Sequence, residues 1–254
     1  MNTPFPGQGP LILAHRGGGK ESVENSWAAI EHMRAHGLTA METDARVTSD
    51  GVVVLHHDAD LQRMCSRPET IRSLTWQELS TIPDASGNSV VRLEDALASF
   101  PEMRFNVDAK DINVVGPLAR IARRHPDRIV ISSFSSFRLA LANRYAPGTY
   151  RSMGMGGVGF LRALSALSRG AAVAMNPVGR GVIAVQVPES FGGIAVTTTS
   201  FIETAHRLNV EVHVWTVDDA ATAQRLIDAG ADGIVTDTPV ALAEHFAAAG
   251  PLRR

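Results

Sequence analysis

The chain has 254 residues, of which 44% are hydrophobic, with 24 basic and 26 acidic side chains. This length suits one (βα)8 barrel but also two small domains, and the nearly neutral charge argues against a nucleic-acid partner. No run of about 18 apolar residues occurs, so no transmembrane segment is expected. Residues 1–10 lack a signal-peptide pattern and Cys65 is the only cysteine, so we expect a cytoplasmic protein without an internal disulfide.

Short runs rich in β-branched residues alternate along the chain with segments of helical periodicity. Strands are predicted at 11–14, 40–47, 104–109, 128–133, 148–153, 183–187, 210–216 and 233–236. Helices are predicted at 25–36, 93–100, 118–124, 137–145 and 220–229. Such alternation predicts a parallel sheet. Eight units in this length favour an α/β fold, a (βα)8 TIM barrel, with residues 1–254 forming one domain.

Two regions interrupt this alternation. After the second strand, the sequence Ser49-Asp50-Gly51 predicts a hairpin, so we interpret about 46–92 as a small insertion and 93–100 as the helix that follows it. Residues 154–174 are rich in Gly, Ala and Met and predict a loop with a helix around 160–168.

Acidic residues fall near the ends of two predicted strands. Glu42 and Asp44 are two positions apart, so their side chains share a face of the strand, and Asp108 stands two residues before Lys110. The C-terminal strand ends of a (βα)8 barrel hold its active site, where a hard divalent cation commonly offsets converging carboxylates. Each pair taken alone is more often a solvated or ion-paired surface feature.

Two histidines also follow predicted strands. His15 and Arg16 follow the first strand, just before three glycines at 17–19, and His57 follows the hairpin strand. Imidazole transfers protons near neutral pH, and guanidinium binds phosphate oxygens through a two-pronged contact. His56 has the opposite parity and is not predicted to be catalytic. Together with the carboxylates and the lysine, these groups suit the cleavage of a phosphodiester.

The order and spacing of these motifs resemble those of the glycerophosphodiester phosphodiesterase family. The matching motifs are H-R-G at 15–17, E-N-S at 24–26, E-T-D at 42–44, D-G at 50–51, H-D at 57–58, S-F at 133–134, W-T-V at 215–217 and D-G-I-V-T-D-T-P at 232–239. The resemblance covers about residues 10–240. The sequence departs from the family pattern at Asp108, where the family more often has Glu, at Val23 and Ser26, and at Asp218, where it has Asn.

The resemblance implies metal-dependent hydrolysis of glycerophosphodiesters to glycerol 3-phosphate and an alcohol, with one divalent cation, Mg²⁺ or Ca²⁺. In the family mechanism, the glycerol 2-hydroxyl attacks phosphorus to give a cyclic phosphate, which water then opens. The implied roles are general acid and base for His15 and His57, metal ligands for Glu42, Asp44 and Asp108, phosphate contacts for Arg16 and Lys110, orientation of the first loop or glycerol binding for Glu24, and a pocket wall for Trp215.

Two other functions stay open. The substrate could be a lysophospholipid, giving lysophospholipase D activity, with the apolar stretch 153–175 sheltering an acyl chain, although that stretch is also typical of a helix and its loop. A catalytically silent barrel could instead bind a phosphorylated metabolite or a partner protein, but it would be expected to lack a histidine or carboxylate that is present here. The sequence leaves the released alcohol, the metal and the oligomeric state open.

Overall fold

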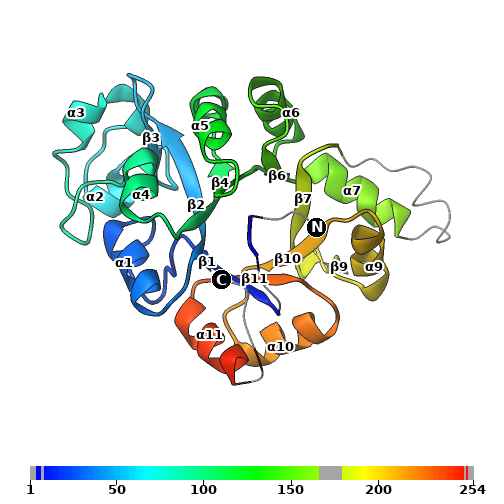
Figure 1. The fold of residues 1–254 in the computed structure, drawn as a ribbon. Coiled ribbons are helices and arrows are strands. Elements are labelled where there is room, and N and C mark those ends of the chain that lie inside the picture. The colour runs from blue at the N-terminus through cyan, green and yellow to red at the C-terminus, as the bar shows by residue number, and fades with distance from the viewer. Residues whose placement is uncertain (1–3, 7–8, 166–178, 249, 251–254) are drawn as a thin grey trace.

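The computed structural model describes residues 4–6, 9–165, 179–248 and 250. Eight parallel strands form a closed ring in the order β1-β11-β10-β7-β6-β5-β4-β2, and β1 pairs with β2 to complete it. Figure 1 shows helices around this ring, so the predicted (βα)8 barrel is confirmed. The strands are β1 (Leu11–His15), β2 (Ala40–Val47), β4 (Arg104–Ala109), β5 (Ile129–Ser132), β6 (Tyr150–Ser152), β7 (Val182–Pro188), β10 (Glu211–Trp215) and β11 (Gly233–Thr236).

Each barrel strand is followed by at least one helix, and all but the last of these connections return the chain to the start of the next strand. Several begin at a side-chain cap, the role that Ser, Thr and Asp prefer; for example, Ser26 accepts a hydrogen bond from the backbone N–H of Ala29. Within the described ranges, none of the helices is both long and apolar enough to cross a bilayer. The helices are α1 (Trp27–Ala35), α4 (Leu93–Ser99), α5 (Ile112–Arg124), α6 (Ser136–Tyr145), α7 (Met155–Leu164), α9 (Thr199–Arg207), α10 (Ala220–Asp228) and α11 (Pro239–Ala247).

Two predicted helix boundaries are wrong. Helix α5 begins at Ile112 rather than at 118, because Asp111 caps it through the backbone N–H groups of Asn113 and Val114. The Gly-Pro pair at 116–117, a sequence typical of a turn, is therefore accommodated inside the helix. Helix α7 begins at Met155 and ends at Leu164, earlier than the predicted 160–168, and positions 166–168 lie outside the described residues.

The hydrophobic core has an inner and an outer part. Inside the ring, Leu11 and Leu13 of β1 pack with Val130 and Val235, and Phe5 joins them from the N-terminal segment. Outside it, larger clusters fill the space between strands and helices, with Phe105 and Phe201 fully buried. Because successive side chains of a strand point to opposite faces, buried parallel strands are apolar on both sides.

The expected insertion follows β2, and a hairpin that the sequence analysis missed follows β7. The insertion adds β3 (Val53–Leu55) antiparallel to β2, then α2 (Gln62–Cys65), a 3₁₀ turn η1 (Ile71–Ser73) and α3 (Trp76–Leu79), around a small core of its own. The missed hairpin pairs β8 (Ser190–Phe191) with β9 (Ile194–Ala195). Its signal was the Gly-Gly pair at 192–193 between short apolar runs, which is typical of a two-residue hairpin turn.

Candidate active site

A pocket of about 540 Å³ lies at the C-terminal ends of the barrel strands. Of the nine side chains predicted to form the site, eight line this pocket, and the ninth, Glu24, contacts Arg16 from outside the lining. The eight come from separate strands and loops, so the barrel brings together residues up to two hundred positions apart. They are His15, Arg16, Glu42, Asp44, His57, Asp108, Lys110 and Trp215.

His15 is held in place by an aspartate from the last barrel strand. Its Nδ1 lies 2.7 Å from Oδ1 of Asp237, and its Nε2 lies 3.9 Å from Oε2 of Glu42. Asp237 directly follows β11, which pairs with β1, so closure of the barrel creates this contact. Burial opposes the charged imidazole, but the hydrogen bond to Asp237 and the nearby carboxylates outweigh it and raise the pKa of His15. The arrangement leaves Nε2 as the nitrogen available for proton transfer.

His57 has a similar support from the loop after β3. Its Nδ1 lies 2.8 Å from Oδ1 of Asp58, whose other oxygen accepts a 2.6 Å hydrogen bond from Nε of Arg63. Burial disfavours the Asp58 charge, but the bonds from His57 and Arg63 prevail and lower the pKa of Asp58 to about 2. Arg46 also donates to the backbone carbonyl of His57 at 2.8 Å. The neighbouring His56 is buried and is not among the residues that line the pocket.

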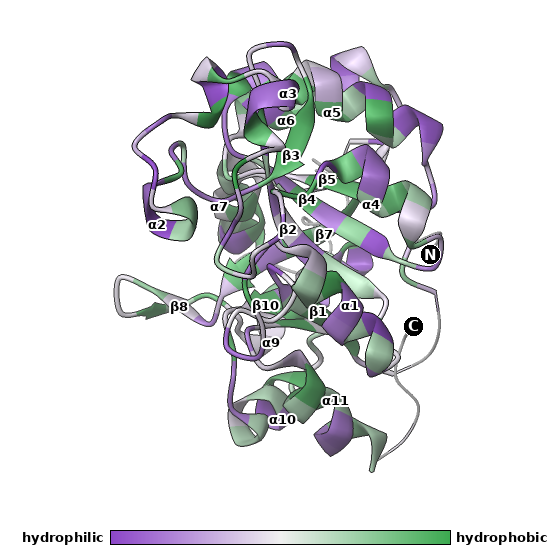
Figure 2. Cartoon of the chain, turned by 90° about the vertical axis from the view of Figure 1, so that its left-hand side faces the viewer, coloured by the Kyte–Doolittle hydropathy of each residue, from purple (hydrophilic) through white to green (hydrophobic). Residues whose placement is uncertain are grey.

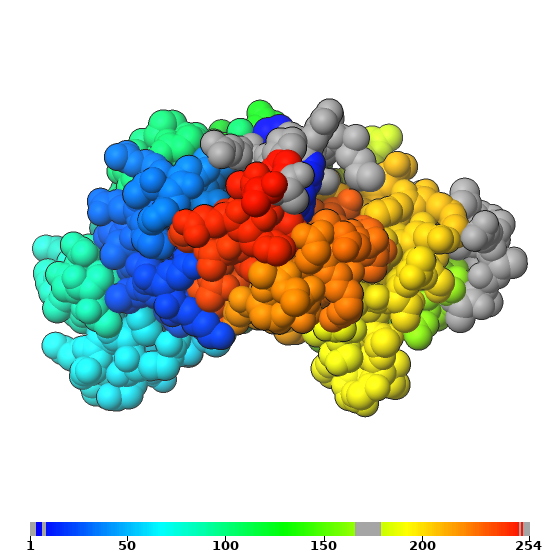
Figure 3. Space-filling model, turned by 90° about the horizontal axis from the view of Figure 1, so that it is seen from below, coloured from blue at the N-terminus to red at the C-terminus, as the bar shows by residue number. Residues whose placement is uncertain are grey.

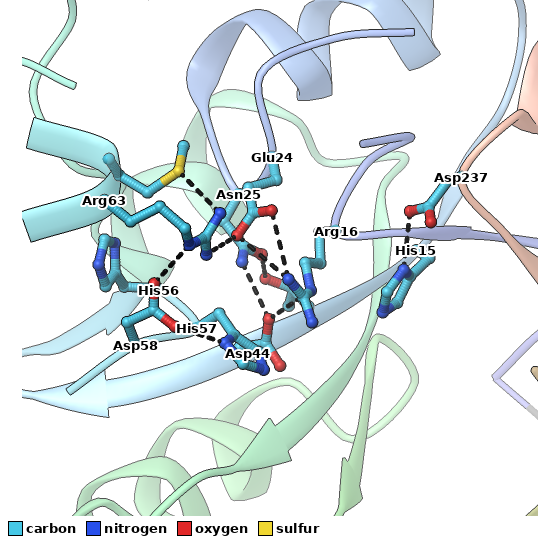
Figure 4. Close-up of polar contacts among 12 residues, drawn as sticks. His15, Arg16, Glu24, Asn25, Asp44, His56, His57, Asp58, Arg63 and Asp237 are labelled. Atoms are coloured by element: carbon cyan, nitrogen blue, oxygen red, sulfur yellow. Dashed lines mark hydrogen bonds and ion pairs between the residues drawn. The ribbon is translucent and has the colours of Figure 1, made fainter. Parts of the chain in front are cut away.

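Arg16 is fixed by its backbone and by two acidic residues. Its φ of 54° lies in the left-handed region, and its N–H donates to the carbonyl of Glu42 at 2.8 Å. Its Nη1 lies 3.2 Å from both carboxylate oxygens of Glu24, and its Nε lies 3.1 Å from Oδ2 of Asp44. Glu24 also accepts a 2.6 Å hydrogen bond from Arg63. Figure 4 shows Glu24 between these two guanidinium groups, and both expected roles of Glu24, orienting the first loop or binding glycerol, stay predictions.

Asp44 lies at the centre of the polar half of the pocket. Its side chain is only 2% exposed, and its oxygens lie 2.7 Å from Nζ of Lys110 and 3.0 Å from Nδ2 of Asn25. Burial would raise the pKa of Asp44, but Lys110, Arg16 and Asn25 together lower it. Lys110 also lies 2.9 Å from Asp108, so one ammonium group bridges two carboxylates.

Glu42 and Asp108 are less well compensated. Burial, reinforced by the charge of Asp44, raises the pKa of Glu42 to about 8, and burial also raises the pKa of Asp108. One oxygen of Asp108, Oδ1, is buried and accepts no hydrogen bond. Three carboxylates, one of which has a buried oxygen without a hydrogen-bond partner, suit a hard divalent cation, because such an ion prefers oxygen ligands. Among the described residues, however, no group of three His, Cys, Asp or Glu side chains is already arranged so that it could hold a metal ion.

The comparisons with known proteins agree with this geometry. The model of the glycerophosphoryl diester phosphodiesterase family matches residues 15–241. The chain belongs to this family. It is 32% identical over 246 residues to the "probable glycerophosphodiester phosphodiesterase 2" of Mycobacterium tuberculosis, covering 95% of this chain and 92% of the relative. It is 24% identical to a Homo sapiens lysophospholipase D over 95% of this chain and 86% of that protein.

The solved structures of the family share the fold. A phosphodiesterase of Oleispira antarctica, solved in complex with the product sn-glycerol-3-phosphate, superposes with a TM-score of 0.75 at 19% identity, covering 94% of this chain and 97% of that one. The resemblance seen in the sequence motifs and the prediction of a phosphodiesterase are thus confirmed by the family match.

The backbone conformation and the packing of the loop after β1 require a glycine at position 17. Its φ is +83°, and a Cβ on it would lie 2.6 Å from Cβ of Ala29. Because both the backbone conformation and the contact penalise a side chain, Gly17→Ala is expected to lower the free energy of unfolding by about 1–3 kcal/mol. Denaturant unfolding measures this. Gly159→Ala, on α7 with nothing within 4 Å, is the matched control and should cost nothing; equal stability of both variants would contradict this account.

Several side chains of the site had no role assigned from sequence. Asp237 stands in the last recognised motif, yet its contact with His15 appears only when the two ends of the barrel meet. Arg63 follows the H-D motif by five residues and bonds its Asp58. No pocket role was assigned from the sequence to most of the apolar wall outside Trp215 and the stretch 153–175, because nothing local distinguishes a pocket-lining apolar residue from a core residue. This wall consists of Phe134, Met153, Met155, Val158, Val187, Pro188, Phe191 and Val196, with the predicted Trp215.

Proposed function

We propose that this enzyme hydrolyses glycerophosphodiesters to sn-glycerol 3-phosphate and an alcohol. The observation that carries the proposal is that two histidines, His15 and His57, each bonded at Nδ1 to an aspartate, line one pocket with three carboxylates and two cations. The M. tuberculosis relative is named for this activity, which supports the same substrate class. A catalytically silent barrel would not need this set of groups.

The two imidazoles act as an acid and base pair. One accepts the proton of the glycerol 2-hydroxyl as that oxygen attacks phosphorus, and the other donates a proton to the departing alcohol. The roles reverse when water opens the cyclic phosphate to glycerol 3-phosphate. Arg16 and Lys110 contact the phosphate oxygens and offset their charge. Asp237 and Asp58 orient the rings, since the nitrogen opposite each aspartate remains free for proton transfer.

A divalent cation, Mg²⁺ or Ca²⁺, would be held by Glu42, Asp44 and Asp108. Bound there, it would polarise a phosphoryl oxygen and offset the charge that develops on the phosphate. The donor chemistry supports this assignment, since all three ligands offer oxygen and Oδ1 of Asp108 is buried without a partner. The side chain of Asp108 is one methylene shorter than the Glu that the family more often has at this position, so its carboxylate extends less far towards the proposed metal.

The proposal is tested by glycerol 3-phosphate release from a panel that includes glycerophosphocholine, glycerophosphoethanolamine and glycerophosphoglycerol. We expect turnover that EDTA abolishes and that added Mg²⁺ or Ca²⁺ restores. The ion that restores the higher rate identifies the better cofactor. Full activity in EDTA would contradict the metal, and absence of product from every soluble diester would contradict the substrate class.

A second candidate activity is hydrolysis of lysophospholipids. The apolar wall of the pocket favours it, because Met155, Phe191 and Trp215 offer a surface for the start of an acyl chain. A relative is named lysophospholipase D, which supports the same alternative. Residues 153–165 of the stretch expected to shelter the acyl chain are described, and 166–175 lie outside the described residues.

The cytoplasmic location and the single domain stay predictions.

A further inference from the structure

The exposed large apolar side chains gather at one part of the barrel rim. Among the described residues, eight such side chains are exposed, and six of them follow the C-terminal ends of the neighbouring strands β4, β5, β6 and β7. We call these six the apolar crescent. They are Ile112 (49% exposed), Phe134 (53%), Phe137 (67%), Met155 (57%), Phe191 (70%) and Ile194 (65%).

The crescent is continuous with the catalytic pocket. Phe134, Met155 and Phe191 belong to both, since they line the pocket and are more than half exposed. The loops that carry them are also joined, because the backbone N–H of Met155 donates to the carbonyl of Phe134 at 3.0 Å. Whatever covers the crescent must therefore leave the pocket accessible or enter it.

The most exposed part of the crescent is the tip of the β8–β9 hairpin. Phe191 and Ile194 face each other across the Gly192-Gly193 turn, and all of residues 190–195 are exposed. Figure 2 shows this hairpin projecting well beyond the barrel on the side where α2 also projects. In Figure 3 the corresponding yellow segment and the cyan insertion stand on either side of a hollow. The insertion presents the charged Arg63 and Arg67 on its side, so the two protrusions differ in polarity.

Three charged side chains near the crescent are engaged within the protein. Glu189 at the base of the hairpin lies 2.8 Å from Arg225, and Asp111 lies 3.5 Å from Arg46. Arg138 donates to the carbonyl of Ala109 at 2.6 Å. Glu189 and Asp111 are each paired with an arginine and Arg138 is bonded to a backbone carbonyl, so the exposed apolar side chains dominate this surface. A partner that is apolar and carries no net charge matches such a surface.

We propose that the apolar crescent docks this enzyme on a zwitterionic lipid surface, a membrane or a micelle, so that the pocket takes a single-chain phosphodiester from that surface. Protruding apolar side chains are suited to entering the boundary between head groups and acyl chains. A phosphodiester would then reach the polar half of the pocket while its chain follows the apolar wall. A folded protein on the crescent would close the pocket, whereas a lipid surface supplies its substrate. The substrate part of this inference rests on the proposed diester hydrolysis.

The test uses two crescent residues that do not line the pocket. The variant Phe137→Ser with Ile194→Ser is compared with Tyr145→Ser, an exposed apolar residue at the other end of α6. Cosedimentation with phosphatidylcholine vesicles should show binding of the parent and of Tyr145→Ser, and about tenfold weaker binding of the double variant. Turnover of glycerophosphocholine should be equal in all three, while turnover of lysophosphatidylcholine above its critical micelle concentration should fall in the double variant alone.

Each alternative has its own result. Failure of the parent to bind vesicles, or equal binding of the double variant, would overturn the docking surface. Binding only to vesicles that contain phosphatidylglycerol would overturn it too, because charge would then be the attraction. A parent dimer that the double variant turns into a monomer would assign the crescent to a second copy of the chain. Vesicle binding without hydrolysis of any diester would leave the docking surface in place and refute the proposed function.

Discussion

Replacing either pocket histidine, as His15→Ala or His57→Ala, is expected to lower kcat by about 10²–10⁴-fold while the fold survives. Each ring supplies one of the two proton transfers in each step, and the described pocket lining holds no third imidazole that could replace the lost one. Both side chains are partly exposed at the rim, so truncation removes little of the core. Steady-state release of glycerol 3-phosphate measures the effect, and thermal unfolding checks the fold.

Two further variants make this prediction sharper. His245→Ala removes an exposed histidine of α11 whose ring contacts Gln224, and it should keep full activity. Asp237→Asn keeps the shape beside His15 but removes the charge that raises its pKa. The limb of the pH–rate profile that reports His15 should therefore move to lower pH, together with a smaller loss of kcat. A fully active His57→Ala enzyme would show that His57 is not part of the acid and base pair.

The barrel could be predicted from the sequence because its strands are buried on both faces. Such strands appear as short, continuous apolar runs, and their alternation with helices leaves few other topologies. Boundaries were harder, since local signals compete. At 116–117 a Gly-Pro pair typical of a turn lies inside α5, because packing of its buried face and the Asp111 cap outweigh the local preference. The β8–β9 hairpin was missed because two-residue strands carry almost no periodicity.

The polar half of the site could be predicted for a similar reason. Its residues stand at strand ends, and parallel strands bring those ends to one rim, so the spacing of Glu42, Asp44 and Asp108 is enough to group them. Contacts that depend on barrel closure could not be derived, such as that between His15 and Asp237, which are 222 positions apart. The bridging position of Lys110 between two carboxylates depends on side-chain packing, which spacing does not specify.

The substitution Glu42→Gln is expected to lower activity and, without a metal, to raise the stability of the folded protein. It should lower kcat by about 10²-fold or more, because it removes a proposed metal ligand at the phosphate site. In EDTA it should nevertheless stabilise the protein at pH 8. The pKa of Glu42 is about 8 in the folded chain and has an ordinary value of 4.5, so the folded state holds a proton that the unfolded state has released. The contribution of the Glu42 side chain to the free energy of unfolding is fully favourable below about pH 4.5 and is lost as the pH rises towards 8.

Thermal unfolding in EDTA between pH 4.5 and pH 8 tests this sign. The melting temperatures of the two proteins should be nearly equal at pH 4.5, and the glutamine variant should gain with rising pH, by at least about 2 °C at pH 8, the shift that ~1 kcal/mol produces in a chain of this size. Glu31→Gln, at an exposed position of α1, should show no such trend. Added Mg²⁺ or Ca²⁺ should stabilise the parent more than the variant, since only the parent retains all three carboxylates. If the parent is the more stable protein at pH 8 in EDTA, the Glu42 charge is compensated without a metal, and the metal assignment loses its electrostatic basis.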